Sequence, residues 1–174
     1  MPLTKLTSLG ITDGTIVNAD INASAAIAAS KLSGVGKVLQ VVTATTTSPT
    51  TTTSTSFVTT NLSVSITPSS TSSRVLVLVT SGSFYNSVIG YALICTIYRG
   101  STNLGATGYG TGLNWGASSR IQAVGTTGVI DSPSSTSSLT YALYIKAENA
   151  SGSVTHISNS DLATIVAMEI GAWL

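Results

Sequence analysis

The sequence predicts an all-β protein, a jelly-roll-like β-sandwich that follows a short N-terminal segment in an extended or helical form. From residue 36 onward, apolar and polar residues alternate in short runs, and clusters of Ser, Thr, Gly, Pro and Asn separate these runs. With 43% hydrophobic residues the chain can bury a core, and 174 residues suggest one compact domain with an appendage. We therefore expect an N-terminal segment over residues 1–35 and a β-sandwich knob over residues 36–174.

The N-terminal segment has a pattern of its own. Its large apolar residues recur every five or six positions, at Leu6, Ile11, Ile16, Ile21, Ile27 and Leu32. This spacing matches neither the helix nor the strand period, although residues 24–32 predict about two turns of helix after an N-cap at Ser24. So few apolar side chains do not fold alone, and we expect these six to anchor the segment on a partner or on copies of itself. A loosely ordered leader is the alternative.

Two kinds of strand are expected in the knob. Residues 58–66 and 140–147 alternate between apolar and polar, which is typical of strands with one buried and one wet face. Residues 74–79 and 91–98 are apolar on both faces, so they need the second sheet on one side and another cover, such as a neighbouring subunit, on the other. Residues 163–174 form a last, largely apolar strand.

The expected turns are rich in Ser, Gly and Asn, and they lie at residues 67–73, 99–103, 131–138 and 149–152. The first and third of them share the sequence PSSTSS and are each followed by a strand. This similarity suggests two equivalent corners of the sandwich rather than a repeat architecture.

Few side chains in this sequence suit catalysis. Only 7% are charged, against about a quarter in an average domain, and there is one His and one Cys. A Ser–His–acid triad would need His156 with Asp131, Asp161 or Glu148, and no GxSxG motif is present. We therefore expect no enzymatic activity, no metal site and no cofactor. His156 is expected in a strand or loop with one ordinary hydrogen bond.

Two further side chains stand in apolar surroundings. Cys95 lies in the run IGYALICTIY and is expected to be a small buried hydrophobe rather than a reactive thiol. Glu169 lies in the sequence AMEIG, and we favour a solvent-facing strand position for it. The alternative is an ion pair with Arg120 or Lys146 across a subunit interface.

One segment is a candidate glycan-binding site. Residues 105–119 contain five glycines together with Tyr109, Asn114 and Trp115. Aromatic faces stack on sugar rings, and glycines allow backbone amides to approach a ligand. The alternative is a long surface loop whose Trp fills a gap in the domain or in a subunit interface.

Several partners and compartments are disfavoured. The basic residues are scattered, whereas nucleic-acid binding needs a clustered basic footprint. No run approaches the roughly 18 apolar residues of a membrane span. The N-terminus lacks the apolar core of a secretory signal, so we expect synthesis in a cytoplasm.

The N-terminal stretch ITDGTIVNADINASAAIAASKLSG resembles the I-x-D-G-T-I-x-N-A-D-I modules of tail-fibre and other surface proteins of tailed bacteriophages. The stretches KVLQVV, ITPSSTSSRVLVLV, YRGSTNLG, DSPSSTSSLTYALYIKA and ATIVAMEIGAWL are similar to a β-rich phage domain. The resemblance implies a virion structural protein that is made in the host bacterial cytoplasm. It also implies a homotrimer of jelly-roll-like knobs at the virion surface, with the N-terminal segment as its anchor.

Two virion roles follow from the resemblance. The trimer either decorates the head as a cement protein bound to the major capsid protein, or it is a short tail fibre or fibre tip. The fibre would be joined to a tail or baseplate adaptor and would bind a host surface glycan. The single leader module favours the first role, and the aromatic glycine-rich segment favours the second. The head role is narrowly preferred, with an enzyme or a cellular adhesin as the remaining class.

Overall fold

The computed structural model describes residues 37–115 and 122–171, and all their regular structure is β-strand. The prediction for the N-terminal segment, with Leu6, Ile11, Ile16, Ile21, Ile27 and Leu32, lies outside these residues. The strands are β1 (Val38–Thr46), β2 (Thr50–Thr52), β3 (Val58–Ile66), β4 (Arg74–Asn86), β5 (Ala92–Arg99), β6 (Thr102–Asn103), β7 (Gly112–Trp115), β8 (Gln122–Asp131), β9 (Leu139–Ala147), β10 (Val154–His156) and β11 (Ala163–Ile170).

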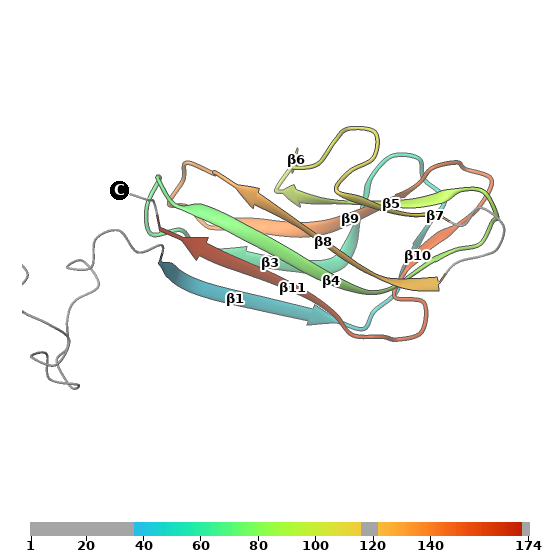
Figure 1. The fold of residues 1–174 in the computed structure, drawn as a ribbon, viewed down its shortest axis with the longest axis horizontal. Coiled ribbons are helices and arrows are strands. Elements are labelled where there is room, and N and C mark those ends of the chain that lie inside the picture. The colour runs from blue at the N-terminus through green and yellow to red at the C-terminus, as the bar shows by residue number, and fades with distance from the viewer. Residues whose placement is uncertain (1–36, 116–121, 172–174) are drawn as a thin grey trace, which may run out of the picture. The chain divides into compact units, whose positions relative to one another are not determined.

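These strands form two antiparallel sheets that pack as a sandwich (Figure 1). The larger sheet has the order β1-β11-β4-β10-β2, with β8 on the other edge of β4, and the smaller has the order β3-β9-β5-β6, with β7 also paired to β5. Without the short β2, β6 and β10, the remaining eight strands, numbered along the chain, run 1-8-3-6 in one sheet and 2-7-4-5 in the other. This is the order of a jelly roll, so the predicted fold class is confirmed.

The core forms because alternate residues of each long strand point inward. In β3 and β9 the inward residues are those that the sequence pattern predicted, and Leu62, Tyr141 and Leu143 are fully buried. From the larger sheet, β4 contributes Val75, Val77 and Val79, while β11 contributes Ala163, Ile165 and Ala167. Burial of one large aliphatic side chain stabilises the fold by about 1.5–3 kcal/mol, so this shared interior holds the two sheets together.

Strand β5 is buried on both faces by the chain itself. Its residues from Ala92 to Ile97 are all buried. The segment after β6 lies over its outer side, where Thr111 N donates to Cys95 O (2.9 Å). A Cβ atom on Gly110 would collide with that carbonyl, and Gly110 has φ 59°, so only glycine fits there. No neighbouring subunit is needed as a cover for this strand.

The glycine-rich segment at residues 105–119 is therefore not one long loop, as the sequence suggested. Its first half packs on β5, and residues Gly112–Trp115 form β7, which pairs with Ala92–Cys95. The prediction took the glycines as signs of loop freedom. Two of them, Gly105 and Gly110, instead permit a close approach to β5.

The two PSSTSS turns occupy equivalent corners, as expected. One joins β3 to β4 and the other joins β8 to β9, so both cross between the sheets. They lie at the same end of the sandwich, because Ile66 pairs with Leu139 and Val75 pairs with Asp131.

Strand β4 changes its partner on one edge midway along its length. Residues from Arg74 to Thr80 pair with β11, whereas Phe84–Asn86 pair with β10. Between them, the pairing with β8 shifts register between Thr80 and Ser83, where Gly82 has φ 62°. Such a bulge bends the strand, and the loop from β10 to β11 lies beside it.

The described part of the chain contains no helix long and apolar enough to cross a membrane.

Candidate functional site

The outer face of the larger sheet is the candidate functional surface because half of it is apolar. The strand register places Val41, Met168, Leu76 and Ile130 in one row across β1, β11, β4 and β8. The next row contains Thr43, Val166, Leu78 and Gly128. The row after that consists of four threonines, Thr45, Thr164, Thr80 and Thr126.

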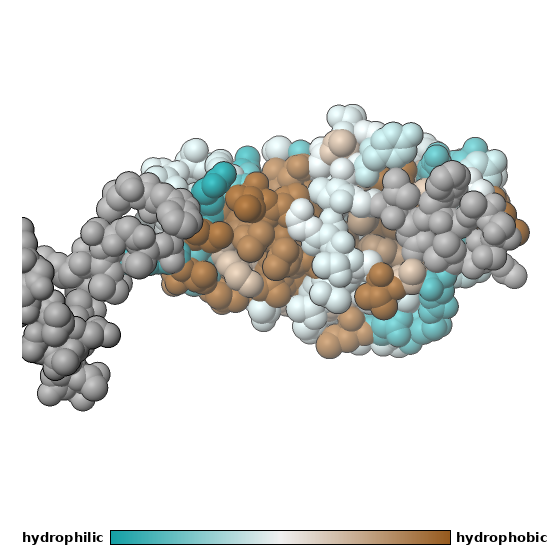
Figure 2. Space-filling model, in the orientation of Figure 1, coloured by the Kyte–Doolittle hydropathy of each residue, from teal (hydrophilic) through white to brown (hydrophobic). Residues whose placement is uncertain are grey.

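We call the apolar part of this surface the apolar face; it comprises Val38, Leu39, Val41, Leu76, Leu78, Ile130, Val166, Met168 and Ile170. Ile130 is 58% exposed and Val41 is 52% exposed, which is high for large aliphatic side chains. Figure 2 shows the face as a broad brown area, bounded by a pale band that crosses the sheet where the threonine row lies. Exposed apolar patches of this kind mark interaction sites. A charged residue, Arg74, lies at the edge of the apolar face, where it pairs with Ile170.

Beneath this surface, Glu169 is enclosed at the end of the sandwich. Its side chain is fully buried, and its carboxylate accepts hydrogen bonds from Ser69 N (2.7 Å), Ser69 Oγ (2.6 Å), Ser73 Oγ (2.7 Å) and Gln40 Nε2 (2.7 Å). Burial by itself would raise the pKa of Glu169. The hydrogen bonds from Ser69, Gln40 and Ser73 outweigh it and lower the pKa to about 2.

The expectation that Glu169 faces solvent is wrong, and no ion pair of Glu169 is found among the described residues. Its partners are all neutral, and Lys146 lies over the ring of Phe57 instead, 4.8 Å from the ring centroid. Arg120 lies outside the described residues. The strand period contained the signal that we missed, because it places Glu169 on the same face as the buried Ile165 and Ala167.

A second carboxylate lies in the same cross-strand row of inward positions. Val75 pairs with Glu169 on one side and with Asp131 on the other. Asp131 accepts two hydrogen bonds from Arg99 Nη1 (2.6 and 2.8 Å) and one from the Tyr141 hydroxyl (2.7 Å). Burial, followed by the nearby Asp131, raises the pKa of Tyr141. The ion pair between Arg99 and Asp131 therefore links the two sheets.

His156 is a strand residue in the core. It is fully buried in β10 beside Phe84, with ring centroids 5.7 Å apart. Neither ring nitrogen has a hydrogen-bond partner among the described residues, so the expected hydrogen bond is not found. Burial lowers the pKa of His156 to about 4, although the Ser81 backbone acts to raise this pKa. The imidazole is neutral near pH 7 and inaccessible to a substrate.

Cys95 is a small buried hydrophobe, as the sequence predicted. It is 3% exposed, and burial raises the pKa of its thiol to about 11. The thiol therefore stays protonated near pH 7. Among residues 37–115 and 122–171, no three His, Cys, Asp or Glu side chains converge on a possible metal site.

The residues of the candidate glycan site are only partly placed. Tyr109 is 64% exposed at the tip of the turn that covers β5. Asn114 and Trp115 lie in β7, opposite Leu93 and Ala92, and their side chains lie outside the described part of the chain. The glycan assignment to these three residues stays a prediction.

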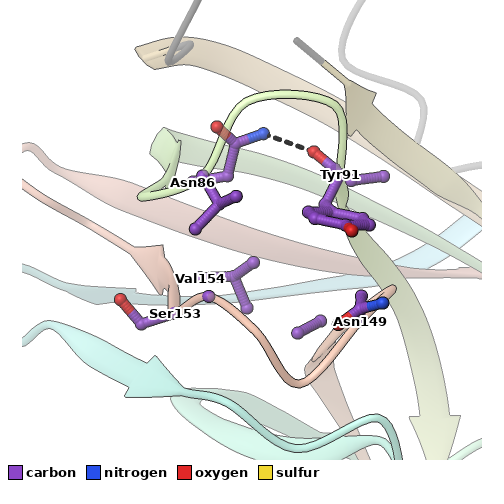
Figure 3. A pocket seen from close by; sticks show the side chains of 9 residues that line it. Asn86, Tyr91, Asn149, Ser153 and Val154 are labelled. Carbon is purple, nitrogen blue, oxygen red and sulfur yellow. Dashed lines mark hydrogen bonds between the residues drawn. The ribbon is translucent and has the colours of Figure 1, made fainter. Parts of the chain in front are cut away.

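A small hollow lies between the turn after β4 and the turn before β10 (Figure 3). Asn86, Tyr91, Asn149, Ser153 and Val154 are among its lining residues, and Asn86 Nδ2 donates to Tyr91 O (2.7 Å). It has room for about one water molecule. It is too small to serve as a ligand site.

No protein-family model matches the chain, and no curated protein is similar to it in sequence. Two similar solved structures are of VP2 from infectious bursal disease virus, one of T=1 particles of a D431N mutant and one of a subviral particle. Each is 18% identical to this chain, with a TM-score of 0.39. The matches cover 76% and 75% of this chain but only 36% and 39% of the VP2 chains.

Glu169→Gln is expected to destabilise the fold by about 2–3 kcal/mol at pH 7, because an amide NH2 would then face either the Ser69 and Ser73 donors at one oxygen position or the Gln40 donor at the other. The wild-type carboxylate stabilises the fold fully above pH 4.5, and this contribution is lost as the pH falls toward 2. Urea unfolding at several pH values measures both effects. Asp161→Asn, at a partly exposed carboxylate, is the control and should change stability by less than about 0.5 kcal/mol.

His156→Leu is expected to stabilise the fold by about 1 kcal/mol at pH 7, because it removes two buried nitrogens that lack partners. As the pH falls from 6.5 to 4, the unfolded wild type binds a proton that the folded state excludes. Stability is therefore lost across this window, by about 3 kcal/mol. Unfolding free energies of both proteins from pH 4 to pH 7 check this. Equal slopes in this range would contradict it.

Proposed function

We propose that this chain is a non-enzymatic structural protein of a bacteriophage virion that assembles as a homotrimer on the particle surface. The observation that carries the proposal is the apolar face, four strands wide, on the outside of a jelly-roll sheet. Its side chains project from paired strands, so the surface is rigid and presents a fixed pattern to a partner. Burying it would remove apolar area from water at roughly 25 cal/mol per Å².

The chemistry of the apolar face suits a second copy of the same chain. In a symmetric oligomer, equivalent residues approach one another around the axis, and like charges among them would repel. The apolar face has no charged residue, and Arg74 lies only at its edge. Copies of the face can therefore pack closely without leaving an unpaired charge buried.

The buried state of the reactive side chains supports a non-enzymatic role. His156 and Glu169 are fully buried, and Cys95 is nearly so. A general base must come within hydrogen-bond reach of its substrate, and none of these three groups reaches the surface. Asp131 forms an ion pair with Arg99 and also accepts a hydrogen bond from Tyr141.

Within the virion, we favour the role of a head decoration or cement protein. The N-terminal segment would bind the major capsid protein through Leu6, Ile11, Ile16, Ile21, Ile27 and Leu32. The resemblance of this segment to a single phage fibre module supports an anchoring role. A short tail fibre, joined to a tail or baseplate adaptor and binding a host glycan, is the alternative.

Charged substitutions in the apolar face are expected to dissociate the trimer without unfolding it. Val41 and Ile130 are more than half exposed, so Val41→Lys with Ile130→Lys should leave the fold intact. Sedimentation velocity should then show a particle of 17.6 kDa instead of three times that mass. The control is Val124→Lys, on the same sheet beyond the threonine row and 71% exposed, which should remain trimeric. A wild-type monomer, or a double variant that stays trimeric, would contradict the assembly proposal.

The copy number of the protein in purified virions distinguishes the two virion roles. Quantitative mass spectrometry should give a ratio to the major capsid protein that approaches one to one, because a decoration protein follows the head lattice. A ratio of a few per cent would indicate the symmetry of a tail and hence the fibre role. Its absence from virions would overturn both roles.

A further inference from the structure

We propose that the outer face of the larger sheet carries a second site, a groove that binds a neutral carbohydrate, on the other side of the threonine row from the apolar face. The strand register places Gln122, Tyr85, Thr155 and Thr51 side by side on β8, β4, β10 and β2. Neighbouring strands lie roughly 4.8 Å apart, so this row spans about 14 Å. These four residues line a hollow of about 430 Å³.

One wall of the groove is held in place by β4. Ile157, Ser158 and Asn159 form this wall, and Ile157 buries its side chain in the core. Ile157 N donates to Ser83 O (2.7 Å), and Ser158 N donates to Ser83 Oγ (3.0 Å). The wall is therefore fixed at two successive residues.

The backbone of this wall is strained. Ile157 has φ 62°, and Ser160, which directly follows the wall, has φ 58°. A positive φ is unfavourable for a β-branched residue such as Ile157. Strained residues of this kind concentrate at ligand sites, where the surrounding structure holds them in a binding geometry. The core contact of Ile157 and the Ser83 hydrogen bonds supply that support here.

The far end of the groove is fixed as well. Pro49 lies there, and Asn61 Nδ2 donates to its carbonyl oxygen (3.4 Å) and to Thr50 Oγ1 (3.3 Å). The hydroxyls of Thr51 and Thr155 are hydrogen-bonded to each other across the floor of the groove (2.9 Å). A floor and walls that are already ordered lose little entropy when a ligand binds.

The groove lining selects the class of ligand. It consists of Pro49, Thr51, Tyr85, Gln122, Thr155, Ile157, Ser158 and Asn159, and none of these is charged. Hydroxyls and amides both donate and accept hydrogen bonds, as sugar hydroxyls require of a partner. A phosphate, sulfate or carboxylate would need Arg or Lys for strong binding. The tyrosine adds an apolar ring with a polar end, which suits the mixed surface of a sugar.

A second hollow of about 460 Å³ adjoins the first at Gln122. It is lined by Leu162 and Val124, which are 60% and 71% exposed, and by Asp161. The two hollows together provide room for more than one sugar unit. Both volumes lie within the range of roughly 300–1,000 Å³ that is usual for small-molecule sites. We therefore expect a disaccharide to bind more tightly than a monosaccharide.

The test is saturation-transfer NMR on the full chain with neutral methyl glycosides of glucose, galactose and N-acetylglucosamine, the disaccharides maltose and lactose, and glucuronic acid as an anionic comparison. At least one neutral sugar should bind, and in amide spectra of the 15N-labelled protein the shift changes that it causes should cluster at Tyr85, Gln122, Thr155 and Ser158. Tyr85→Ala should weaken binding at least tenfold. Gln122→Ala, which replaces an exposed residue at a strand end, should also weaken binding. It provides a second test if the Tyr85→Ala variant misfolds.

Tyr109→Ala tests the other candidate glycan site, and Ile89→Ala, at a 53% exposed side chain outside the groove, is the control that should leave binding unchanged. Binding that depends on Tyr109 and not on Tyr85, or binding of glucuronic acid alone, would overturn the proposal. So would the absence of binding by all the neutral sugars. The assembly proposal fails independently, because Val41 and Ile130 lie in a different row of the sheet.

Discussion

Closure of the sandwich at one end depends on the buried carboxylate of Glu169. It joins Gln40 at the start of β1 to Ser69 and Ser73 in the turn between β3 and β4, while its own strand is β11. Gln40 Nε2 also donates to Thr67 O (2.6 Å), so the turn is held at several points. A buried charge is unfavourable unless it is hydrogen-bonded, and here each bond comes from a neutral donor. The ends of β1 and β11 and the turn between β3 and β4 are consequently fixed by one anion without a cation.

The same use of neutral groups extends over the rest of the protein. With 7% charged residues, the chain satisfies its polar atoms mainly with hydroxyls and amides. Among the described residues, one salt bridge, Arg99–Asp131, links β5 to β8 at the same end of the sandwich. Contacts between hydroxyls and apolar groups depend little on ionic strength, whereas exposed ion pairs are screened by salt.

The larger sheet has an outer face with two chemically different halves. The row of Thr45, Thr164, Thr80 and Thr126 separates the apolar face from the hydroxyl- and amide-lined groove around Tyr85. The bulge in β4 between Thr80 and Ser83 lies at this boundary and supports the strained turn at Ile157. The proposed assembly surface and the proposed ligand groove therefore lie on separate halves of one sheet, with no residue shared between the two.

The sequence by itself determined the strands, since side-chain alternation is local and has a period of two. Residues 58–66 and 140–147 were predicted in this way, whereas the burial of Cys95 was predicted from its apolar run and the two PSSTSS corners from their turn residues. Only the tertiary structure decided what packs across the chain. The glycines at 105 and 110 indicated a free loop, and their close approach to β5 depends on a pairing that sequence patterns do not specify. The row of Gln122, Tyr85, Thr155 and Thr51 likewise comes from four strands that are distant in sequence, and only the strand register brings them together.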